Sequence, residues 1–385
     1  MMRRARIFSA RELGAGEVAA WQSLRDGAQV YRSPFFAPGF IAAIGAVRPD
    51  VRVAMCETDG RPALGFAYHR RPGAFVRPIG APWSDWQGPV MAPDIAFDPG
   101  DLLDVVGGDA IRYTGLADPF GRFQSGRLRS ADSWFADLAG GAKAYRAALE
   151  TQQKSNLANT RRVFRRAERE IGPVRFTMND PDRGAFDQLM AWKRQRYAET
   201  GSYDILAVRW VEALMDRLWD QRDEQFGGVL STVRFGDKIA GATFHLRDDA
   251  WWSAWIMGYD PQFHALGPGR ILIDQFLQVA DEHGVAALEF GPGGDEYKSK
   301  WCLHTLPVYE ALWHGHGVAG RVRATARRGW HGVAKSLGPA NRVLERARSR
   351  TDHICAAHAN WIGASKGIAS TVFGRRPKIV AEATS

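Results

Sequence analysis

The residues best suited to chemistry in this sequence form a glycine-rich loop at the start of a predicted helix. Residues 258–291 read GYDPQFHALGPGRILIDQFLQVADEHGVAALEFG. Gly267 and Gly269 lack side chains, so a ligand can approach the main chain closely there. The first N–H groups of a helix have no intrahelical partner and lie at the positive end of its dipole, which favours a phosphate or pyrophosphate. An ordinary Gly/Pro turn is the alternative, because neither a Walker lysine nor a full G-x-G-x-x-G is present.

Reactive side chains also gather in two other loops. The stretch GGDEYKSKW brings Asp295, Tyr297 and Lys298 into one glycine-rich turn, for which a solvated turn with a packed tyrosine is the alternative. Asp85 and Trp86 lie in a polar and aromatic stretch, DWQGPV. An aromatic face beside a carboxylate suits a sugar, whose C–H faces stack while the acid accepts hydrogens from hydroxyl or amine groups. A buried tryptophan next to a capping aspartate is an equally good interpretation.

The elements that must position these residues follow from the hydrophobic pattern. Residues 31–135 are rich in Gly, Pro and aromatic residues in short alternating runs, which predicts mostly strand and loop. From residue 141, GGAKAYRAALETQQKSNLANTRRVFRRAERE predicts one helix. A strand, two helices, a three-strand meander, the glycine loop with its helix, and two further strands come next, and Gly201 ends the first of the two helices. The pattern predicts an α/β (α+β) fold with a domain boundary near residue 140.

Composition limits the class of protein. The chain has 385 residues, 45% of them hydrophobic and 24% charged, which indicates about two globular domains. Cys56, Cys302 and Cys355 are far apart without a CxxC, so neither a disulfide framework nor a metal site is expected. No apolar run approaches the length of a membrane span or a secretory segment, which predicts a cytoplasmic protein, with peripheral association at the inner membrane as an option.

The net charge of +9 is concentrated at the C-terminal end. Residues 316–385 contain 13 Lys and Arg against three acidic residues, a net +10 that leaves the first 315 residues at −1. On the predicted long helix, Arg161, Arg165 and Arg169 share a face, but Glu168 and Glu170 interrupt it. The near-neutral body argues against binding of double-stranded nucleic acid.

The element order and several motifs resemble the GNAT acyltransferase core. That family's loop reads Gln/Arg-x-x-Gly-x-Gly/Ala, and this chain has His264-Ala-Leu-Gly267-Pro-Gly269, so only the first position departs from it. The stretches SPFFAPGF, DWQGPV, KSNLANTRRVFRRAERE, YDPQFHALGPGRILI and FGPGGDEYKSKW are similar to the acetyltransferases associated with bacterial cellulose and exopolysaccharide synthesis, the CelD/BcsL-like branch related to FemAB-type aminoacyltransferases. The resemblance covers about residues 30–315.

This resemblance implies an architecture and a donor site. It implies two GNAT-like domains in tandem, with mixed, mostly antiparallel sheets flanked by helices, over residues 1–140 and 141–315, and a basic, partly helical tail over 316–385. Acetyl-CoA would lie as co-substrate between the strands WWSAWIMGY and AALEF, with no metal. The implied donor-binding residues are Ile256, Met257, Gly258, His264, Gly267, Gly269 and Arg270.

The resemblance also gives roles to the other candidates. The substrate amine is the nucleophile, so the protein places it, accepts its proton and protonates the departing thiolate. Tyr297 is the candidate acid, Lys298 orients a carbonyl or phosphate oxygen, and Glu289 or His245 is the candidate base. The predicted substrate-binding residues are Asp85, Trp86 and Asp295.

The implied activity is N-acetylation of an amino sugar of a bacterial surface polysaccharide, such as an exopolysaccharide or a cellulose- or holdfast-type adhesin, or of its precursor. A FemAB-like aminoacyltransferase using charged tRNA is one alternative, and the near-neutral charge of the body argues against it. A non-catalytic regulatory protein on a GNAT fold is another, and His264 at the usual Gln/Arg position is its best support.

The basic tail predicts a regulatory or docking role. Arginines recur at a spacing of four residues, which places two guanidinium groups on one helical face and suits contact with phosphates. These residues are Arg323, Arg327, Arg342, Arg346 and Arg350. Cyclic di-GMP, an anionic membrane surface and a synthase complex are the candidate partners, and a solvated helical tail is the alternative.

Overall fold

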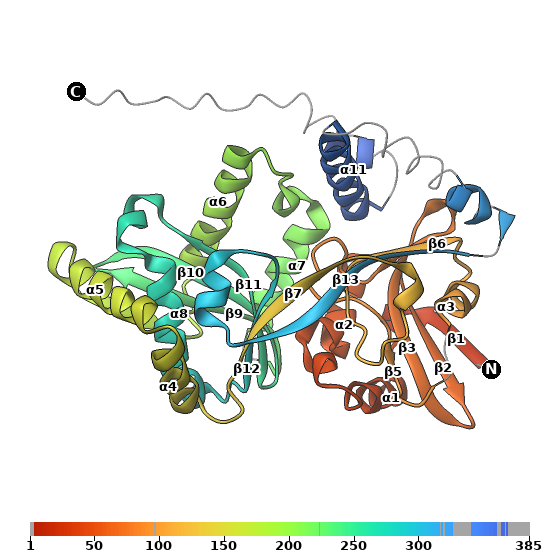
Figure 1. The fold of residues 1–385 in the computed structure, drawn as a ribbon, viewed down its shortest axis with the longest axis horizontal. Coiled ribbons are helices and arrows are strands. Elements are labelled where there is room, and N and C mark those ends of the chain that lie inside the picture. The colour runs from red at the N-terminus through yellow and green to blue at the C-terminus, as the bar shows by residue number, and fades with distance from the viewer. Residues whose placement is uncertain are drawn as a thin grey trace.

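One mixed sheet runs through the whole molecule (Figure 1). The computed structural model describes residues 4–95, 98–222, 224–315, 317–318, 320–325, 340–359, 363–365 and 367–368. Within these residues 13 strands pair in the order β1-β2-β3-β4-β6-β13-β7-β12-β11-β10-β9-β8, and β5 pairs with β3. The pairs β4–β6 and β11–β12 are parallel and the other strand pairs are antiparallel, which confirms the predicted mixed, mostly antiparallel pairing. The sheets predicted for the two domains form one continuous sheet.

The two halves of the chain repeat one order of elements, β-α-α-β-β-β-α-β-β. The first half consists of β1 (Arg4–Ser9), α1 (Ala15–Arg25), α2 (Pro38–Val47), β2 (Val51–Thr58), β3 (Arg61–Arg70), β4 (Phe75–Pro78), α3 (Pro99–Val106), β6 (Ala110–Leu116) and β7 (Arg127–Asp137), with the short β5 (Val90–Met91) added. The second consists of β8 (Val174–Thr177), α6 (Arg183–Thr200), α7 (Arg209–Asp220), β9 (Phe226–Phe235), β10 (Lys238–Asp248), β11 (Trp251–Tyr259), α8 (Pro268–Val279), β12 (Ala287–Pro292) and β13 (His304–His314), with α9 (Glu296–Trp301) added. The repeat agrees with two domains of one fold in tandem.

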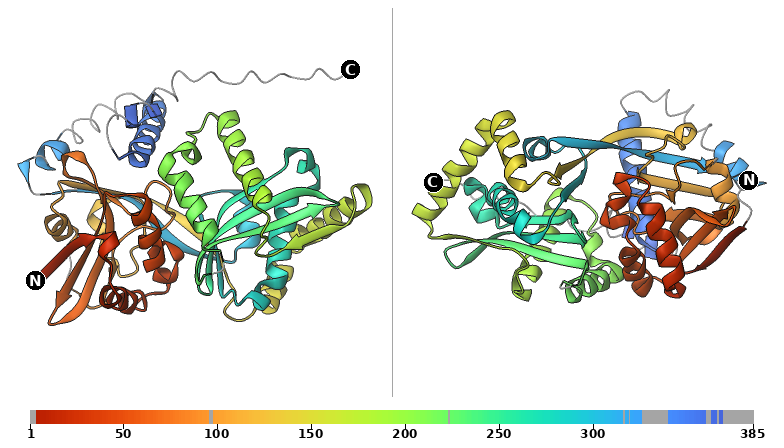
Figure 2. Two further views of the ribbon diagram at one scale, coloured as in Figure 1. Left: turned by 180° about the vertical axis from the view of Figure 1, so that it is seen from behind. Right: turned by 90° about the horizontal axis from the view of Figure 1, so that it is seen from below.

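The last strand of each half crosses to the other half. Strand β7 pairs with β12 of the second half, and β13 pairs with β6 of the first and with β7. The predicted boundary at residue 140 falls in the turn between β7 and the next helix. Because both long strands cross this boundary, hydrogen bonds of the sheet join the two halves (Figure 2).

Two local predictions need correction. The single helix predicted from residue 141 is two helices, α4 (Ala142–Gln152) and α5 (Lys154–Glu170), because Gln153 leaves the helical conformation. Its side chain donates to the carbonyl of Ser299, and Asn156 donates to that of Lys300, so tertiary contacts stabilise the break. Residues 31–135 also contain α2 and α3, in addition to the predicted strands and loops.

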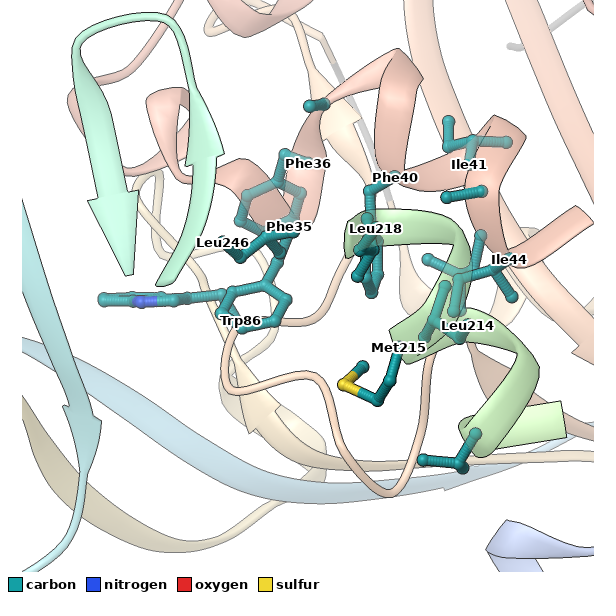
Figure 3. Close-up of a cluster of buried hydrophobic side chains, with 14 of the residues drawn as sticks. Phe35, Phe36, Phe40, Ile41, Ile44, Trp86, Leu214, Met215, Leu218 and Leu246 are labelled. Atoms are coloured by element: carbon teal, nitrogen blue, oxygen red, sulfur yellow. The ribbon is translucent and has the colours of Figure 1, made fainter. Parts of the chain in front are cut away.

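Helices cover both faces of the second half of the sheet. Neighbouring residues of β10 point to opposite faces. Phe244 contacts Phe186 of α6, whereas His245 contacts Phe276 of α8. At the junction of the two halves α2 packs against α7, with Phe40, Ile41 and Ile44 facing Leu214, Met215 and Leu218 (Figure 3). Among the helices that the structure describes, none is long and apolar enough to cross a bilayer.

Candidate active site

Strands β11 and β12 are neighbours only over their first three residues. Ser253 pairs with Glu289, and beyond this pair β11 continues along β10 while β12 continues along β7. The divergence begins at a β-bulge, because Ser253 and Ile256 of β11 are three residues apart but pair with Leu246 and Phe244 of β10, which are two apart. We call this divergence the splay. No described strand pairing covers the β12 side of β11 beyond Ser253, so backbone groups there are available to a ligand.

The start of α8 lies directly after β11 and is open to an anion. Gly267 ends the 3-10 turn Pro261–Leu266 in the left-handed conformation, with φ 59°, and no side chain caps α8. A Cβ on Gly269 would meet only the ring of Tyr259, at 3.9 Å. The first turn of α8 holds no acidic residue, and Arg270 lies within it. The positive end of the helix is therefore suited to a phosphate.

The predicted donor residues lie around these two features. Ile256, Met257 and Gly258 lie on β11 beyond the splay. His264 is exposed, and its Nδ1 lies 3.0 Å from the hydroxyl of Tyr259, with the two rings stacked. The side chain of His264, at the loop position that differs from the GNAT pattern, is thus held against the end of β11.

The first half lacks both features, which provides an internal comparison. The equivalent helix, α3, has Asp98 as its N-cap, whose side chain accepts from the Gly100 N–H at 2.7 Å, and Asp101 lies in its first turn. The gap between β4 and β6 is filled by Gln87, which bridges to Leu116 and whose side chain pairs with Thr114. Of the two equivalent helices, only α8 therefore has a start that is suited to a phosphate.

Two carboxyl groups from opposite halves meet beside the splay; we call Asp85 and Glu289 the carboxyl pair. The loop after β4 carries Asp85 to Gly291 of β12, where a Cβ would lie 2.4 Å from Asp85 Oδ2. Gly291 has φ 71°, so glycine is favoured there by both conformation and space. Asp85 is half-buried, and Glu289 is 1% exposed.

The environment of the carboxyl pair favours protonation of both groups. Burial raises the pKa of Asp85 to about 6, although Lys298 opposes the shift. Burial also raises the pKa of Glu289 well above its ordinary value, and the charge of Asp85 adds to this, while a hydrogen bond from Ser33 opposes it. The Ser33 Oγ donates to Glu289 Oε2 at 2.9 Å, and Trp86 lies beside the same carboxyl group. Asp85 keeps more contact with solvent than Glu289 does, so its carboxylate form is the less costly of the two to bury.

The glycine-rich turn after β12 brings the other predicted residues to the same end of the splay. Lys298 is buried, and its Nζ donates to the carbonyl of Pro292 at 2.7 Å and lies 3.6 Å from the carboxylate of Asp295. Tyr297 is 39% exposed, and partial burial together with the charges of Asp295 and Asp85 raises its pKa. Its hydroxyl therefore stays protonated at neutral pH and can donate a hydrogen bond.

Two predicted residues have other surroundings than expected. His245 is buried between Trp252 and Phe276, and burial lowers its pKa to about 3, so the ring is neutral and lies apart from the carboxyl pair. Trp86 is 3% exposed and belongs to a buried cluster with Phe35 and Leu246 (Figure 3). Its ring is covered, so the predicted stacking of a sugar on Trp86 is not available in this structure.

Sequence reasoning missed Ser33 and Gly291. Ser33 lies in the SPFFAPGF stretch, which carried a resemblance but no role. A lone serine 256 positions away from Glu289 gives no pairing signal. Gly291 lies within β12 at the start of a glycine-rich run, and only its contact with Asp85 distinguishes it from its neighbours.

Glu289→Gln is expected to retain activity within about tenfold of the wild type. Glutamine matches protonated glutamate in shape and can still accept from Ser33, and burial already favours the protonated form of the wild-type Glu289. Because the pKa of Glu289 is higher in the folded chain than in the unfolded chain, wild-type stability falls as pH rises above the unfolded-state pKa. The variant lacks this ionisable group, so its stability should fall less over the same pH range. Rates and thermal unfolding between pH 5 and 8 measure both. Equal pH dependence of stability in the two proteins would contradict this assignment.

Comparison with protein families finds a match, which covers α5 and most of the second half. Residues 154–299 match the family model of the acetyltransferase (GNAT) domain, a class that uses acetyl-CoA. A search of curated proteins found no match.

Three solved structures are similar over most of the chain. One is the C-terminal domain (DUF2156) of a protein described as a lysylphosphatidylglycerol synthetase from Agrobacterium fabrum, with 14% identity, coverage of 81% of this chain and 96% of that one, and a TM-score of 0.47. Another is a tandem GNAT protein from the clavulanic acid biosynthesis pathway, with 11% identity, coverage of 81% and 98%, and a TM-score of 0.45. L-PGS from Bacillus licheniformis has 13% identity, coverage of 82% and 96%, and a TM-score of 0.42.

Proposed function

We propose that this protein is an acyl-CoA-dependent N-acetyltransferase whose acceptor is an amino sugar of a bacterial surface polysaccharide or its precursor. The observation that carries the proposal is the splay beside the uncapped start of α8. An acyl donor with a diphosphate fits this pair of features, because the helix start takes the phosphates and the free edge of β11 takes an extended amide-containing arm. The GNAT match over residues 154–299 supports the same donor.

Asp85 is the residue best placed to accept the proton of the amine. A nitrogen that attacks a thioester carbonyl forms a C–N bond and loses a proton, while the C–S bond breaks and the sulfur leaves as a thiol. Asp85 is half-buried and ionises near pH 6, close to the pH at which a general base works well, whereas Glu289 is covered. Tyr297 is exposed at the same end of the splay and serves as hydrogen-bond donor to the departing sulfur.

An aromatic pair near Asp85 supports a sugar acceptor. Trp83 and Trp255 are each half-buried, their ring centroids lie 5.5 Å apart, and the Trp255 N–H donates to the carbonyl of Trp83. Half-buried indole rings beside a carboxylate can contact the C–H face of a sugar while the acid takes the amine hydrogens. The resemblance of several sequence motifs to exopolysaccharide acetyltransferases favours the same acceptor class.

Release of free thiol from acetyl-CoA tests this function. Purified protein should release thiol with glucosamine or a nucleotide-linked amino sugar, and not with the matched sugar that carries a hydroxyl in place of the amine. Mass spectrometry should find one acetyl group on the nitrogen. Thiol release that does not depend on an amine, or turnover of charged tRNA without acetyl-CoA, would overturn the proposal.

A further inference from the structure

A cluster of buried arginines lies away from the splay, where α2, β3, β4 and β6 of the first half meet α11 (Ala340–Ala357) (Figure 1). We call Arg48, Arg71, Arg77 and Arg112 the arginine cluster. Their side chains are between 3% and 11% exposed. Four guanidinium groups held out of water need negative charge nearby, since an unpaired buried cation is costly.

Asp50 partners the first two arginines. Arg48 donates to both carboxylate oxygens of Asp50, at 2.7 and 2.6 Å, and Arg71 Nη1 lies 3.5 Å from the same carboxylate. Burial alone would raise the pKa of Asp50, but hydrogen bonds from His69 and Arg48 outweigh it and hold the pKa well below its usual range. Asp50 is therefore ionised, and it is one charge between two cations.

Asp352 of α11 partners the other two. Arg77 makes a bidentate pair with Asp352, and Arg112 Nε lies 3.3 Å from it. Arg71 donates to the carbonyl of Ala356. The helix is also tied to the second half, because the indole N–H of Trp210 donates to the carbonyl of Ala357 at 2.7 Å. Helix α11 thus closes the cluster at the junction of the two halves.

The regulatory arginines predicted in the tail lie outside this cluster. Arg350 donates to the carbonyl of Gly201, and Arg323 donates to that of Gly73 at 2.6 Å, so both contact the protein itself. Arg327 lies outside the described residues, as do the side chains of Arg342 and Arg346. The predicted tail partners therefore stay untested, and the buried cluster is a separate feature.

Charges within the cluster do not balance. Four arginines face Asp50 and Asp352, and Glu310, 3.9 Å from Arg112, also pairs with the exposed Arg129 at 3.4 Å. His69 does not add a charge at neutral pH, because burial and Arg48 lower its pKa to about 4. Four buried donor atoms of the cluster have no hydrogen-bond partner among the described residues: Arg48 Nη1, Arg71 Nε, Arg71 Nη1 and Arg112 Nε. The last two lie within 3.5 Å of a carboxylate, whereas the first two form no ion pair within the described part of the chain. The cluster therefore has an excess of positive charge and unpaired hydrogen-bond donors.

We propose that the arginine cluster binds a phosphoryl group of a small soluble anion. Planar guanidinium groups recognise tetrahedral oxyanions with paired donors, and two spare positive charges match a dianion. The site is independent of the proposed acetyl transfer, because none of its residues borders the splay. Binding there would add contacts between the first half and α11, so it would stabilise the folded chain.

Thermal unfolding of the full chain in inorganic phosphate tests the proposal, with chloride added to keep ionic strength constant. The melting temperature should rise with phosphate and follow a saturating single-site dependence. Arg71→Gln should remove this response, while Arg129→Gln, at an exposed position, should keep it. Asp352→Asn, which removes one internal competitor, should tighten phosphate binding by roughly tenfold if it removes about 1.4 kcal/mol of competition.

A direct measurement of phosphate binding to the wild-type chain provides a test even if a variant does not fold. Phosphorus NMR of the wild-type chain should show saturable broadening of the inorganic phosphate line that pyrophosphate reverses. Broadening or thermal shifts of equal size in wild type and Arg71→Gln would mean an adventitious ion only and would overturn the proposal. Binding to phosphatidylglycerol vesicles that inorganic phosphate does not displace would also contradict it, since the phosphoryl group would then be that of a lipid surface.

Discussion

Asp85→Asn is expected to lower kcat by roughly 10²- to 10⁴-fold at pH 7, the usual contribution of a general base. Asp85 is half-buried at the splay, and its raised pKa of about 6 still leaves the carboxyl group mostly ionised at neutral pH. Asparagine keeps the shape but cannot accept the proton. Acetyl-CoA binding should be unchanged, because the start of α8 and the edge of β11 are untouched. Steady-state kinetics together with calorimetry of donor binding separate the two effects.

The pH dependence gives this prediction a second readout. A base acts only when deprotonated, so wild-type kcat/KM should rise as pH increases through about 6, the raised pKa of Asp85. Asp85→Asn should lose this rise. Asp94→Asn, an exposed aspartate in the same connection between β4 and α3, is the matched control and should behave as wild type. If Asp85→Asn keeps wild-type rates while Glu289→Gln loses them, the roles of the pair are reversed.

Gly269→Asp is expected to weaken acetyl-CoA binding about 100-fold. The substitution places a carboxylate at the helix start proposed for the diphosphate, and contact between like charges costs several kcal/mol. A loss of about 2.7 kcal/mol is enough to weaken binding 100-fold. Gly269 is a better position than Gly267 for this test, because Gly267 has a positive φ and a Cβ there would meet the Arg270 side chain at 3.1 Å. Isothermal calorimetry measures the loss.

Two controls isolate the charge from the side chain. Gly269→Ala adds a Cβ whose nearest neighbour is the ring of Tyr259, at an ordinary contact distance of 3.9 Å, and should bind acetyl-CoA nearly as wild type does. Gly140→Asp adds the same charge in the turn between β7 and α4, where nothing lies within 4 Å, and should also bind normally. Equal affinity of Gly269→Asp and wild type would exclude the start of α8 as the phosphate site.

Local sequence patterns predicted the second half well. The meander β9–β11, the glycine loop, α8 and the flanking strands occur in the predicted order because each has its own periodicity and turn residues. The helix end at Gly201 was equally readable, since the residue takes the left-handed conformation that favours glycine. The same patterns placed Gly267 and Gly269 at the start of a helix.

Those local patterns do not predict which strands from distant parts of the chain pair with each other. Nothing in β7 or β13 indicates that each crosses to the other half, because strand partners are chosen by tertiary packing rather than by local composition. The carboxyl pair is hidden for the same reason, since Asp85 and Glu289 are joined only when the loop after β4 reaches β12. Trp86 was misassigned because an aromatic residue beside an acid has the same sequence signature whether it is buried or exposed.

Amide hydrogen exchange with and without acetyl-CoA tests the central claim most directly. If the donor lies at the splay, acetyl-CoA should slow exchange in peptides covering residues 254–258 of β11 and 268–272 at the start of α8. Peptides covering residues 98–102 at the capped start of α3 should be unchanged. Protection at α3 instead, or saturable acetyl-CoA binding with no protection at β11 and α8, would contradict the account.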